Sequence, residues 1–441
     1  MMFHLTQNIG HRAGAATIAA EIEAAIAAGT LAPGTRLPTV RDLAATLEVS
    51  PATVATAYRT LGQRGLISGN GRRGTVVTSQ PPLRVRGART LPANTRDLAS
   101  GNPDPALLPA LAPALAQLDP AHKLYGGPAK LARLAGLAEA AFAADGIAGD
   151  IAVVGGALDG IERTLQTQLL PGDRVAVEDP GWPRISDLVR SLGLWPEPVR
   201  IDQAGLIPDE LAVALGRGAK AVIATPRGQN PTGAAVDEPR GRLLREVLGR
   251  HRDVIVIEDD YVAAVAGAPY VSLHDASPRW VVIRSLSKVL GPDLRVAPMA
   301  GDALTISRVE GRQLLGAGWV SHLLQQTAAN LWAGEGTRDL LARAERTYAQ
   351  RREALVHALA RCGITSYGRT GLGVWVPLPE EVATVQQLLE RGWAVSPGER
   401  FRFRAPAGIR ITTTTLDPGD AGDLAAAIDE IVHAPTATYA G

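Results

Sequence analysis

The chain begins with apolar residues that recur at helical spacing. Residues 13–29 are rich in alanine, and Ile18, Ile22 and Ile26 occupy every fourth position on one face. This spacing is typical of an amphipathic helix, and Gly29 is a residue type at which helices commonly end. The sequence therefore predicts a helix over 13–29, followed by the turn-rich connector LAPGTRLP.

Two further helices are indicated by the residues at their N-terminal ends. Thr39 is followed three positions later by Asp42, a pattern in which the two side chains cap the start of a helix. Ser50 precedes Pro51, which pairs a favoured capping residue with a favoured first helical residue. We expect a short second helix after Thr39 and a third helix that reaches Gly65.

Two short β-type runs, LIS and TVV, follow the third predicted helix on either side of the sequence NGRRG. Asn70-Gly71 is typical of a two-residue hairpin turn, and it places Arg72 and Arg73 at the tip. Three helices and a basic-tipped hairpin predict a winged helix-turn-helix, whose third helix enters the major groove of DNA. The alternative is a small packing domain whose arginines face water.

The charge distribution favours the DNA-binding alternative. Residues 1–90 hold ten arginines and four acidic residues, a net charge of +6, whereas the remaining 35 basic and 40 acidic residues give −5. A basic N-terminal region joined to a mildly acidic remainder favours binding of the N-terminal region to a polyanion such as DNA. The candidate DNA contacts are polar or basic side chains on the second helix, the third helix and the wing: Arg41, Thr53, Thr56, Arg59, Arg72 and Arg73.

Beyond residue 95, apolar runs of strand length alternate with helical segments for more than three hundred residues. The runs are DIAVVGG, DRVAVED, AVIATP, DVIVIEDD and WVVIRS. Alternation of this kind predicts an α/β fold with a largely parallel sheet. The preceding stretch, 79–95, is rich in proline, arginine and threonine without a period, which is typical of an exposed linker.

Composition places the chain among ordinary globular proteins. Its 441 residues are 46% hydrophobic and 20% charged, and this length predicts two or three domains. No apolar run approaches the length that crosses a bilayer, and the first residues lack the apolar core of a signal peptide. The single cysteine, Cys362, excludes internal disulfides and multi-cysteine metal sites. We expect a cytoplasmic protein with no membrane partner and no metal.

Polar residues gather where the predicted strands end, and open α/β sheets bind their ligands at such ends. In VVGGALDG a helix starts after a Gly-Gly turn, and its first amides suit a phosphate. EDPGWPR presents Trp182, and GQNPTG presents Asn230. VIVIEDDY ends in three acids and Tyr261, a cluster that is costly to bury without a cation or hydrogen-bonded partners. Each motif alone also fits an ordinary loop or packing role.

The sequence SLSKVLGPDLR adds a lysine whose amine can react. Lys288 is one of only four lysines among 45 basic residues, so arginine supplies plain positive charge elsewhere. A lysine amine can lose its proton and become a nucleophile, whereas a guanidinium stays charged. Pyridoxal phosphate needs such a lysine, together with a carboxylate for its ring nitrogen, a stacking aromatic ring and a phosphate cradle. Nicotinamide or flavin would leave the lysine unexplained, and their GxGxxG fingerprint is absent.

The N-terminal region resembles the GntR-type transcriptional regulators. The sequence GTRLPTVRDLAATLEVSPATVATAYRTLGQRGLISGNGRRGTVV follows their pattern through nearly the whole wing. The resemblance implies that Arg41, Ser50 and Thr53 lie at DNA-contacting positions. Many members carry arginine after the capping serine, where this chain has Pro51, so the base specificity of relatives does not carry over directly.

The remainder, from about residue 96, resembles the fold-type I aminotransferases, and head and body together resemble the MocR subfamily of GntR-type regulators. The resemblance implies that Lys288 forms the internal aldimine with pyridoxal 5'-phosphate and that Arg410 binds the carboxylate of an effector. It places the other cofactor contacts at Asp259 for the pyridine nitrogen, Asn230 and Tyr261 for the phenolic oxygen, Trp182 for the ring, and Ala157, Leu158, Ser285, Ser287 and Arg295 for the phosphate. Tyr125 is implied to reach the phosphate of the partner subunit in a homodimer.

The resemblance implies the domain order and the function. We expect a winged helix-turn-helix over 1–78, a linker over 79–95 and an aminotransferase-like effector domain over 96–441, with a large part at about 120–330 and a small part at about 96–119 and 331–441. The implied function is a regulator that binds operator DNA and senses an amino compound or the vitamer itself. The alternative is a genuine pyridoxal-phosphate-dependent aminotransferase with an N-terminal extension.

Overall fold

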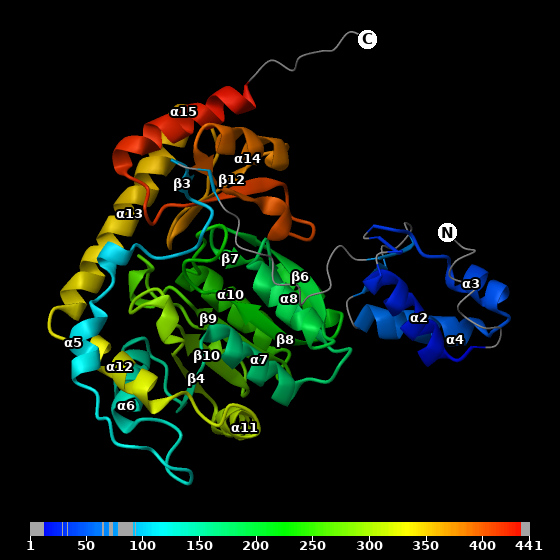
Figure 1. Cartoon of the computed structure of the whole chain (residues 1–441), viewed down its shortest axis with the longest axis horizontal. Coiled ribbons are helices and arrows are strands. Elements are labelled where there is room, and N and C mark those ends of the chain that lie inside the picture. The colour runs from blue at the N-terminus through cyan, green and yellow to red at the C-terminus, as the bar shows by residue number, and fades with distance from the viewer. Residues whose placement is uncertain are drawn as a thin grey trace. The chain divides into compact units, whose positions relative to one another are not determined.

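The computed structural model describes residues 13–28, 30–32, 34–63, 66–69, 74–77, 91–92 and 94–433 (Figure 1). The N-terminal unit and the body that follows it are described separately below. Arg72 and Arg73, which the sequence placed at the tip of the wing, lie outside the described residues.

The N-terminal unit has the predicted order of three helices followed by two strands. The helices are α2 (Ala15–Ala27), α3 (Val40–Leu47) and α4 (Pro51–Gln63), and the strands are β1 (Ile67–Gly69) and β2 (Thr75–Val77). The strands pair antiparallel, as a wing requires. Ile18 and Ile22 are fully buried against leucines of the other two helices, so the apolar face predicted from the sequence forms the core of this unit.

The predicted helix starts are confirmed by their capping contacts. The Thr39 hydroxyl accepts a hydrogen bond from the Asp42 amide at 3.2 Å, and the Ser50 hydroxyl accepts one from the Thr53 amide at 3.1 Å. Side-chain caps satisfy amides that have no partner inside the helix. The Tyr58 hydroxyl donates to the Pro38 carbonyl at 2.8 Å, which ties α4 to the connector before α3.

The large part of the body is built on an eight-stranded sheet with the order β4-β11-β10-β9-β8-β5-β6-β7. Parallel pairing joins β8, β9 and β10, while β11 runs antiparallel between β10 and β4. The strand bounds are β4 (Asp150–Val154), β5 (Arg174–Asp179), β6 (Trp195–Asp202), β7 (Gly205–Leu206), β8 (Ala219–Ala224), β9 (Ile255–Asp260), β10 (Trp280–Arg284) and β11 (Ala297–Gly301). The central strands are buried along their length, which explains their continuous apolar runs.

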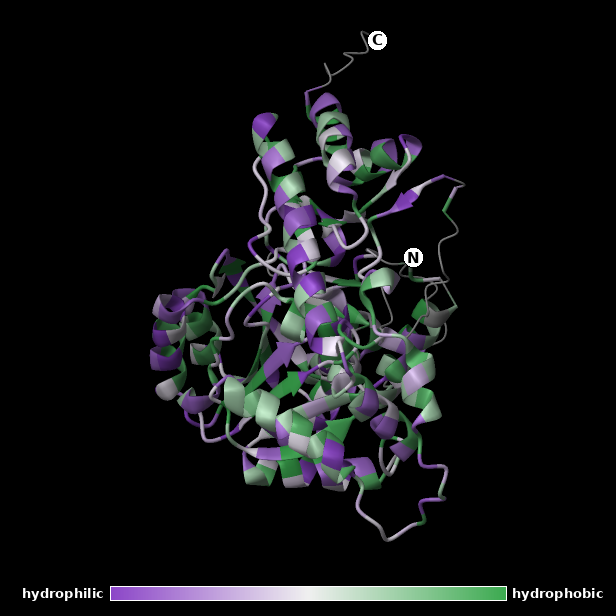
Figure 2. Cartoon of the chain, turned by 90° about the vertical axis from the view of Figure 1, so that its left-hand side faces the viewer, coloured by the Kyte–Doolittle hydropathy of each residue, from purple (hydrophilic) through white to green (hydrophobic). Residues whose placement is uncertain are grey.

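Helices accompany this sheet along the chain and carry hydrophilic and hydrophobic residues side by side, as the view of Figure 2 shows for one side of the body. Their bounds are α6 (Ala132–Ala144), α7 (Ala157–Gln168), α8 (Pro183–Ser191), α9 (Pro208–Gly216), α10 (Glu238–Gly249), α11 (Ala303–Leu314) and α12 (His322–Trp332). Mixed faces of this kind pack one side on a core and expose the other. Within the described part of the chain, no helix has both the length and the apolar composition needed to span a bilayer.

The small part of the body combines the end of the chain with the segment that follows the linker. A three-stranded antiparallel sheet contains β12 (Gly373–Pro377), β15 (Gly408–Thr412) and β14 (Ser396–Pro397), in that order. A second pair joins β3 (Arg96–Asp97) to β13 (Trp393–Ala394) in parallel. The helices here are α13 (Thr337–Arg361), α14 (Glu381–Glu390) and α15 (Ala421–Val432), whereas α5 (Leu111–Ala116) packs on α12 of the large part. The first strand after the linker therefore belongs to this small part, which lies beside the large sheet in Figure 1.

Candidate functional site

The candidate site lies where parallel strands of the large sheet end. β9 and β10 end at Asp260 and Arg284, which are paired across the two strands, and β4 ends at Val154 opposite the start of β11. Since β11 is antiparallel to both β4 and β10, the carboxyl ends of β4 and β10 share one edge of the sheet. This edge collects the loops that carry the predicted cofactor residues.

Lys288 follows β10 by four residues, and its amine is held by a backbone carbonyl. Its Nζ donates to the carbonyl oxygen of Gly101 at 2.5 Å. Burial, with a smaller contribution from the positive charge of Arg410, lowers the pKa of Lys288 from its usual value to about 8. A lysine with this pKa has an appreciable neutral fraction near physiological pH, as a nucleophilic amine requires.

Arg410 projects from β15 of the small part and is buried beside the lysine. Its guanidinium donates to the Ala99 carbonyl, to the Ser396 hydroxyl at 3.2 Å and to the Asn230 side-chain oxygen at 3.3 Å. Burial is the main cause that lowers the pKa of Arg410 to about 10. The Phe401 ring lies 5.1 Å from the guanidinium carbon, within the range of a cation–π contact. Arg410 is therefore a desolvated cation suited to a carboxylate.

Asp259 is the penultimate residue of β9, and one oxygen of its carboxylate has no hydrogen-bond partner among the described residues. The residue is 3% exposed, and its Oδ1 atom makes no hydrogen bond with any described residue. Burial raises the pKa of Asp259 to about 8, with smaller contributions from the charges of Asp260 and Glu178. An unpartnered buried carboxylate is costly, so this oxygen requires a donor such as a protonated ring nitrogen.

Tyr261, Asn230 and Trp182 come from three different loops of the same edge. The Tyr261 hydroxyl donates to the Gly228 carbonyl at 2.7 Å, and burial raises the pKa of this phenol above its usual value. Asn230 reaches the site through its bond to Arg410. Trp182 is half-buried directly before α8, in a loop whose Gly181 amide donates to the Phe401 carbonyl at 2.7 Å.

The predicted phosphate residues meet at the start of α7. The Arg295 guanidinium donates to the Gly155 carbonyl at 3.1 Å and lies against Gly156, where an added Cβ would fall 2.4 Å from Nη2. Gly156 also has a φ of 112°, so the chain needs glycine here for both space and backbone conformation. Ala157 and Leu158 begin the helix, whose first amides lack partners inside it. Ser285 and Ser287 follow β10, and the Ser287 amide donates to the Ser285 hydroxyl at 3.2 Å.

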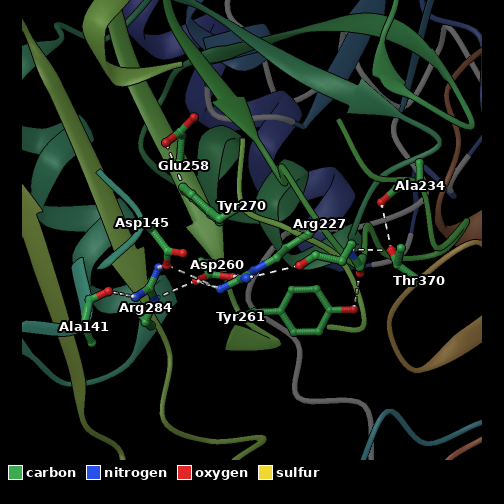
Figure 3. A network of polar contacts seen from close by, with 12 residues as sticks. Ala141, Asp145, Arg227, Ala234, Glu258, Asp260, Tyr261, Tyr270, Arg284 and Thr370 are labelled. Carbon is green, nitrogen blue, oxygen red and sulfur yellow. Dashed lines mark hydrogen bonds and ion pairs between the residues drawn. The ribbon is translucent and has the colours of Figure 1, made fainter. Parts of the chain in front are cut away.

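A buried charge network that the sequence did not predict lies on the face of β9 opposite to Asp259. Figure 3 shows Asp260 between two arginines: Arg227 donates to its two oxygens at 2.9 Å each, and Arg284 donates at 2.7 Å. Arg284 also donates to Asp145 at 2.6 Å. These guanidinium groups lower the pKa of Asp260, although burial opposes them. The only sequence signal was the run of three acids, which indicated a cation or hydrogen-bonded partners at this strand end.

Breaking this network should destabilise the body strongly. Replacing Arg284 with alanine removes the bonds to Asp260 and Asp145 and leaves Asp260 with one cation in a fully buried position. We expect the free energy of unfolding to fall by about 3 kcal/mol, because the buried Asp260 carboxylate keeps only one of the two cations that compensate its desolvation. Urea unfolding followed by tryptophan fluorescence reports the body selectively, since all seven tryptophans lie beyond residue 181. Replacing the exposed Arg242 with alanine is the control and should change the value by less than about 0.5 kcal/mol.

Tyr125 does not join the other site residues within this chain. Its side chain is 91% exposed, and its ring makes an edge contact with Trp319 at 5.5 Å. Leu124 beside it is 79% exposed. Such exposure leaves Tyr125 free to contact a second subunit, in line with the role that the resemblance implies.

The predicted DNA-contacting residues are distributed over α3 and α4. Arg41, Thr56 and Arg59 are exposed, and Thr56 and Arg59 are three residues apart on one face of α4. Ser50 and Thr53 are engaged with each other, since their hydroxyl oxygens lie 2.8 Å apart. Ser50 therefore also serves as the cap of α4, and the exposed arginines are the groups most available to a phosphate.

Comparison with protein families gives two matches that divide the chain. A family described as "Aminotransferase class I and II" matches residues 94–428, and one described as "Bacterial regulatory proteins, gntR family" matches residues 15–77. The first match spans most of the body and the second spans the three helices and the wing strands.

Individual relatives match over most of the chain. The vitamin B6 salvage pathway transcriptional repressor PtsJ of Salmonella typhimurium is 39% identical, with 92% of this chain and 96% of the relative covered. The HTH-type pyridoxine biosynthesis transcriptional regulator PdxR of Corynebacterium glutamicum is 28% identical, with 77% of each chain covered. Among solved structures, the kynurenine aminotransferase of Pyrococcus horikoshii aligns with a TM-score of 0.70 at 23% identity, over 78% of this chain and 92% of its own. The last comparison establishes the fold of the body.

Proposed function

This chain belongs to the aminotransferase class I and II family and joins that domain to a GntR-type regulatory domain, which is the combination found in MocR regulators. We propose that it controls transcription in response to an amino compound or a vitamer bound at Lys288. Two relatives are named as a transcriptional repressor and an HTH-type transcriptional regulator, and the GntR domain implies binding to double-stranded DNA. The relative named for vitamin B6 salvage supports a vitamer as one ligand.

Pyridoxal phosphate is the cofactor that the aminotransferase family indicates, and the residues of the site fit it. The unpartnered oxygen of Asp259 matches the ring nitrogen, and the cradle of Gly156 and Arg295 matches the phosphate. When bound, the cofactor supplies an aldehyde that condenses with primary amines and a pyridine ring that withdraws electrons. We assign Lys288 as the amine and Trp182 as the ring contact.

The remaining residues are assigned the roles that the family resemblance implies for them. Tyr261 and Asn230 would hold the phenolic oxygen of the cofactor, and the phosphate would be held by Ser285, Ser287, Ala157 and Leu158. Arg410 binds the carboxylate of an amino compound, because its guanidinium is desolvated and offers a fork of donors. Tyr125 completes the site of a second subunit, which makes a homodimer the proposed assembly.

The proposed division of labour follows the domain order. Residues 1–78 bind DNA, 79–95 connect, and 96–441 bind cofactor and effector; we place this activity in the cytoplasm, where a bacterial regulator meets its operator. One observation carries the proposal: in a chain that also contains a GntR domain, Lys288, an amine of lowered pKa, lies beside Arg410, a buried cation suited to a carboxylate.

Replacing Arg59 with alanine tests the DNA-binding half of the proposal. We expect weaker binding to every duplex and a slope of log affinity against log salt that is smaller by about 1, because one phosphate contact is lost. Arg59→Lys keeps the charge and should keep most of the slope. Fluorescence anisotropy over a salt series measures both quantities. An unchanged slope in Arg59→Ala would show that this residue does not contact DNA. If the wild type shows no salt-sensitive and sequence-selective binding to DNA, the proposal that the protein is a transcriptional regulator is wrong.

An aminotransferase activity is the second candidate function. The site contains both an amine at Lys288 and a carboxylate-binding arginine at Arg410, which a transamination half-reaction requires. Steady turnover of an amino acid with a keto acid at enzyme-like rates would favour this candidate. A regulator requires only reversible binding and no turnover.

A further inference from the structure

The segment that continues the linker into the body passes directly over the ligand site. Residues 99–101 follow β3, and their backbone carbonyls hold both cations of the site: Ala99 accepts from Arg410, and Gly101 accepts from Lys288. Ser396 reinforces the first contact, because its hydroxyl donates to the same Ala99 carbonyl at 3.1 Å and accepts from Arg410. The bridging segment, defined as residues 99–101, thus occupies the donors that a ligand needs.

The bridging segment is fixed at both ends. The amide of Leu98 donates to Ala394 and its carbonyl accepts from the Thr412 amide at 2.8 Å, while the Asn102 carbonyl accepts from Thr414 at 2.8 Å. Leu98 is buried in the core of the small part. A change in the conformation of residues 99–101 must therefore shift Leu98 or Asn102, the fixed residues on either side. Leu98 directly follows β3, which continues the linker.

A side chain outside the ligand site sets the conformation of the bridging segment. Asp97 accepts hydrogen bonds from the amides of Ala99 and Ser100, both at 2.9 Å, which forms a tight turn at the end of β3. Asp97 itself is exposed and makes no direct contact with Lys288 or Arg410 among the hydrogen bonds of the described residues. Its charge acts on Arg410 through space, so Asp97→Ala removes both this charge and the acceptor of the turn, whereas Asp97→Asn removes the charge alone.

A carboxylate ligand competes with the Ala99 carbonyl for the same guanidinium. A bidentate, charge-assisted pair is roughly twice as strong as a hydrogen bond to a neutral carbonyl, so a carboxylate at Arg410 would displace Ala99. A ligand can shift an equilibrium only through different affinities for two conformations, and this competition supplies the difference. Ligand binding at Arg410 is therefore coupled to residues 99–101, which continue through β3 into the linker and the DNA-binding domain.

We propose that residues 99–101 are the transmitting element of the regulator: a carboxylate at Arg410 releases the Ala99 carbonyl, and the loosened turn at Asp97 alters the constraint on β3 and the linker. This inference deepens the proposed function and rests on it. In this arrangement Asp97 is a positioning residue, and Arg410 has two roles, as ligand group and as the holder of the bridging segment.

The experiment is a double-mutant cycle between Asp97→Ala and Arg410→Gln in the full-length protein, with Asp97→Asn as the matched control. Asparagine keeps the side-chain oxygen that accepts from the two amides, whereas alanine removes it. Hydrogen exchange of the amides of Ala99 and Ser100 reports the turn. The affinity for the duplex that wild-type protein selects from a random library reports transmission.

We expect Asp97→Ala to speed exchange of these two amides about tenfold and to change DNA affinity about fivefold, the scale of one lost hydrogen bond. Arg410→Gln should change DNA affinity in the same direction, and the double variant should match the larger single effect instead of their product, because both changes release one element. Asp97→Asn should stay within about twofold of wild type in both measurements.

Three results would overturn the inference. They are unchanged exchange in Asp97→Ala, faster exchange with unchanged DNA affinity, and effects of the two variants that multiply independently. A wild-type protein that selects no duplex would instead overturn the proposed function together with this inference. Selective wild-type binding with an unresponsive Asp97→Ala would overturn the inference alone.

Discussion

Replacing Lys288 with alanine should abolish covalent capture of pyridoxal phosphate. Lys288 is the only lysine that follows β10, its amine lies beside Arg410, and burial has already lowered its pKa to about 8. Arginine cannot replace it, since a guanidinium remains charged and does not condense with an aldehyde. Reduction with borohydride followed by intact-mass measurement should show one added cofactor in the wild type and none in Lys288→Ala.

Lys220→Ala is the matched control for this prediction. Lys220 is an exposed lysine whose amine pairs with Asp253 at 3.1 Å, so its removal should leave capture unchanged. A cofactor adduct that persists in Lys288→Ala would show that another amine reacts. Loss of the adduct in both variants would point instead to damage of the fold.

The pH dependence of capture follows from the lowered pKa of Lys288. Only the neutral amine attacks an aldehyde, so the rate should rise as pH increases through about 8. Between pH 7 and pH 9 the neutral fraction, and with it the initial rate, should rise about tenfold. Stopped-flow absorbance of the cofactor measures this rate. A profile that keeps rising steeply above pH 10 would mean that the lysine has an ordinary pKa and that its environment differs from the one described.

Most of the architecture could be predicted from the sequence because its signals are local. Helix caps at Thr39 and Ser50 and continuous apolar runs at β9 and β10 report their own secondary structure, and the structure places them as expected. Strand β11 had no such signal, since its sequence APMAG lacks β-branched residues, and it forms by pairing with β4 and β10.

The parts of the site that escaped prediction depend on contacts between distant residues. Arg227 and Arg284 are 57 positions apart and meet only because β8 and β10 flank β9. The backbone carbonyls of Ala99 and Gly101 carry no side-chain signal, and their contacts with Arg410 and Lys288 join residues that are 311 and 187 positions apart. Sequence motifs thus indicated the candidate side chains of the site, while the partners that hold these side chains could be found only from the fold.

Asp259→Asn should weaken cofactor binding about 100-fold while it stabilises the cofactor-free protein at alkaline pH. The carboxylate oxygen Oδ1 has no hydrogen-bond partner among the described residues, and a charged bond to the ring nitrogen is worth about 2–3 kcal/mol. Asparagine retains the shape but loses the charge that holds a proton on that nitrogen. Equilibrium dialysis with pyridoxal phosphate measures the loss, best in a Lys288→Ala background where capture does not interfere.

The stability effect has the opposite sign because of the raised pKa of Asp259. The folded-state pKa is about 8 against 3.8 for a free carboxyl group, so the folded protein holds this proton more tightly than the unfolded chain does. The wild-type free energy of unfolding should therefore fall as pH rises from about 4 to about 8. Asp259→Asn removes this contribution and should be more stable than wild type by at least about 1 kcal/mol above pH 8.

These opposite signs separate a binding role for Asp259 from a structural one. Replacing a residue that is needed for folding would lower both the stability and the cofactor affinity of the protein. A carboxylate that serves the cofactor instead destabilises the cofactor-free protein and becomes favourable only when the cofactor binds. Glu178→Gln is the control: Glu178 is equally buried but accepts bonds from Thr225 and Gln229, so it has partners without the cofactor. Its replacement should change cofactor affinity by less than about threefold. Equal losses in the two variants would contradict the assignment of Asp259 to the ring nitrogen.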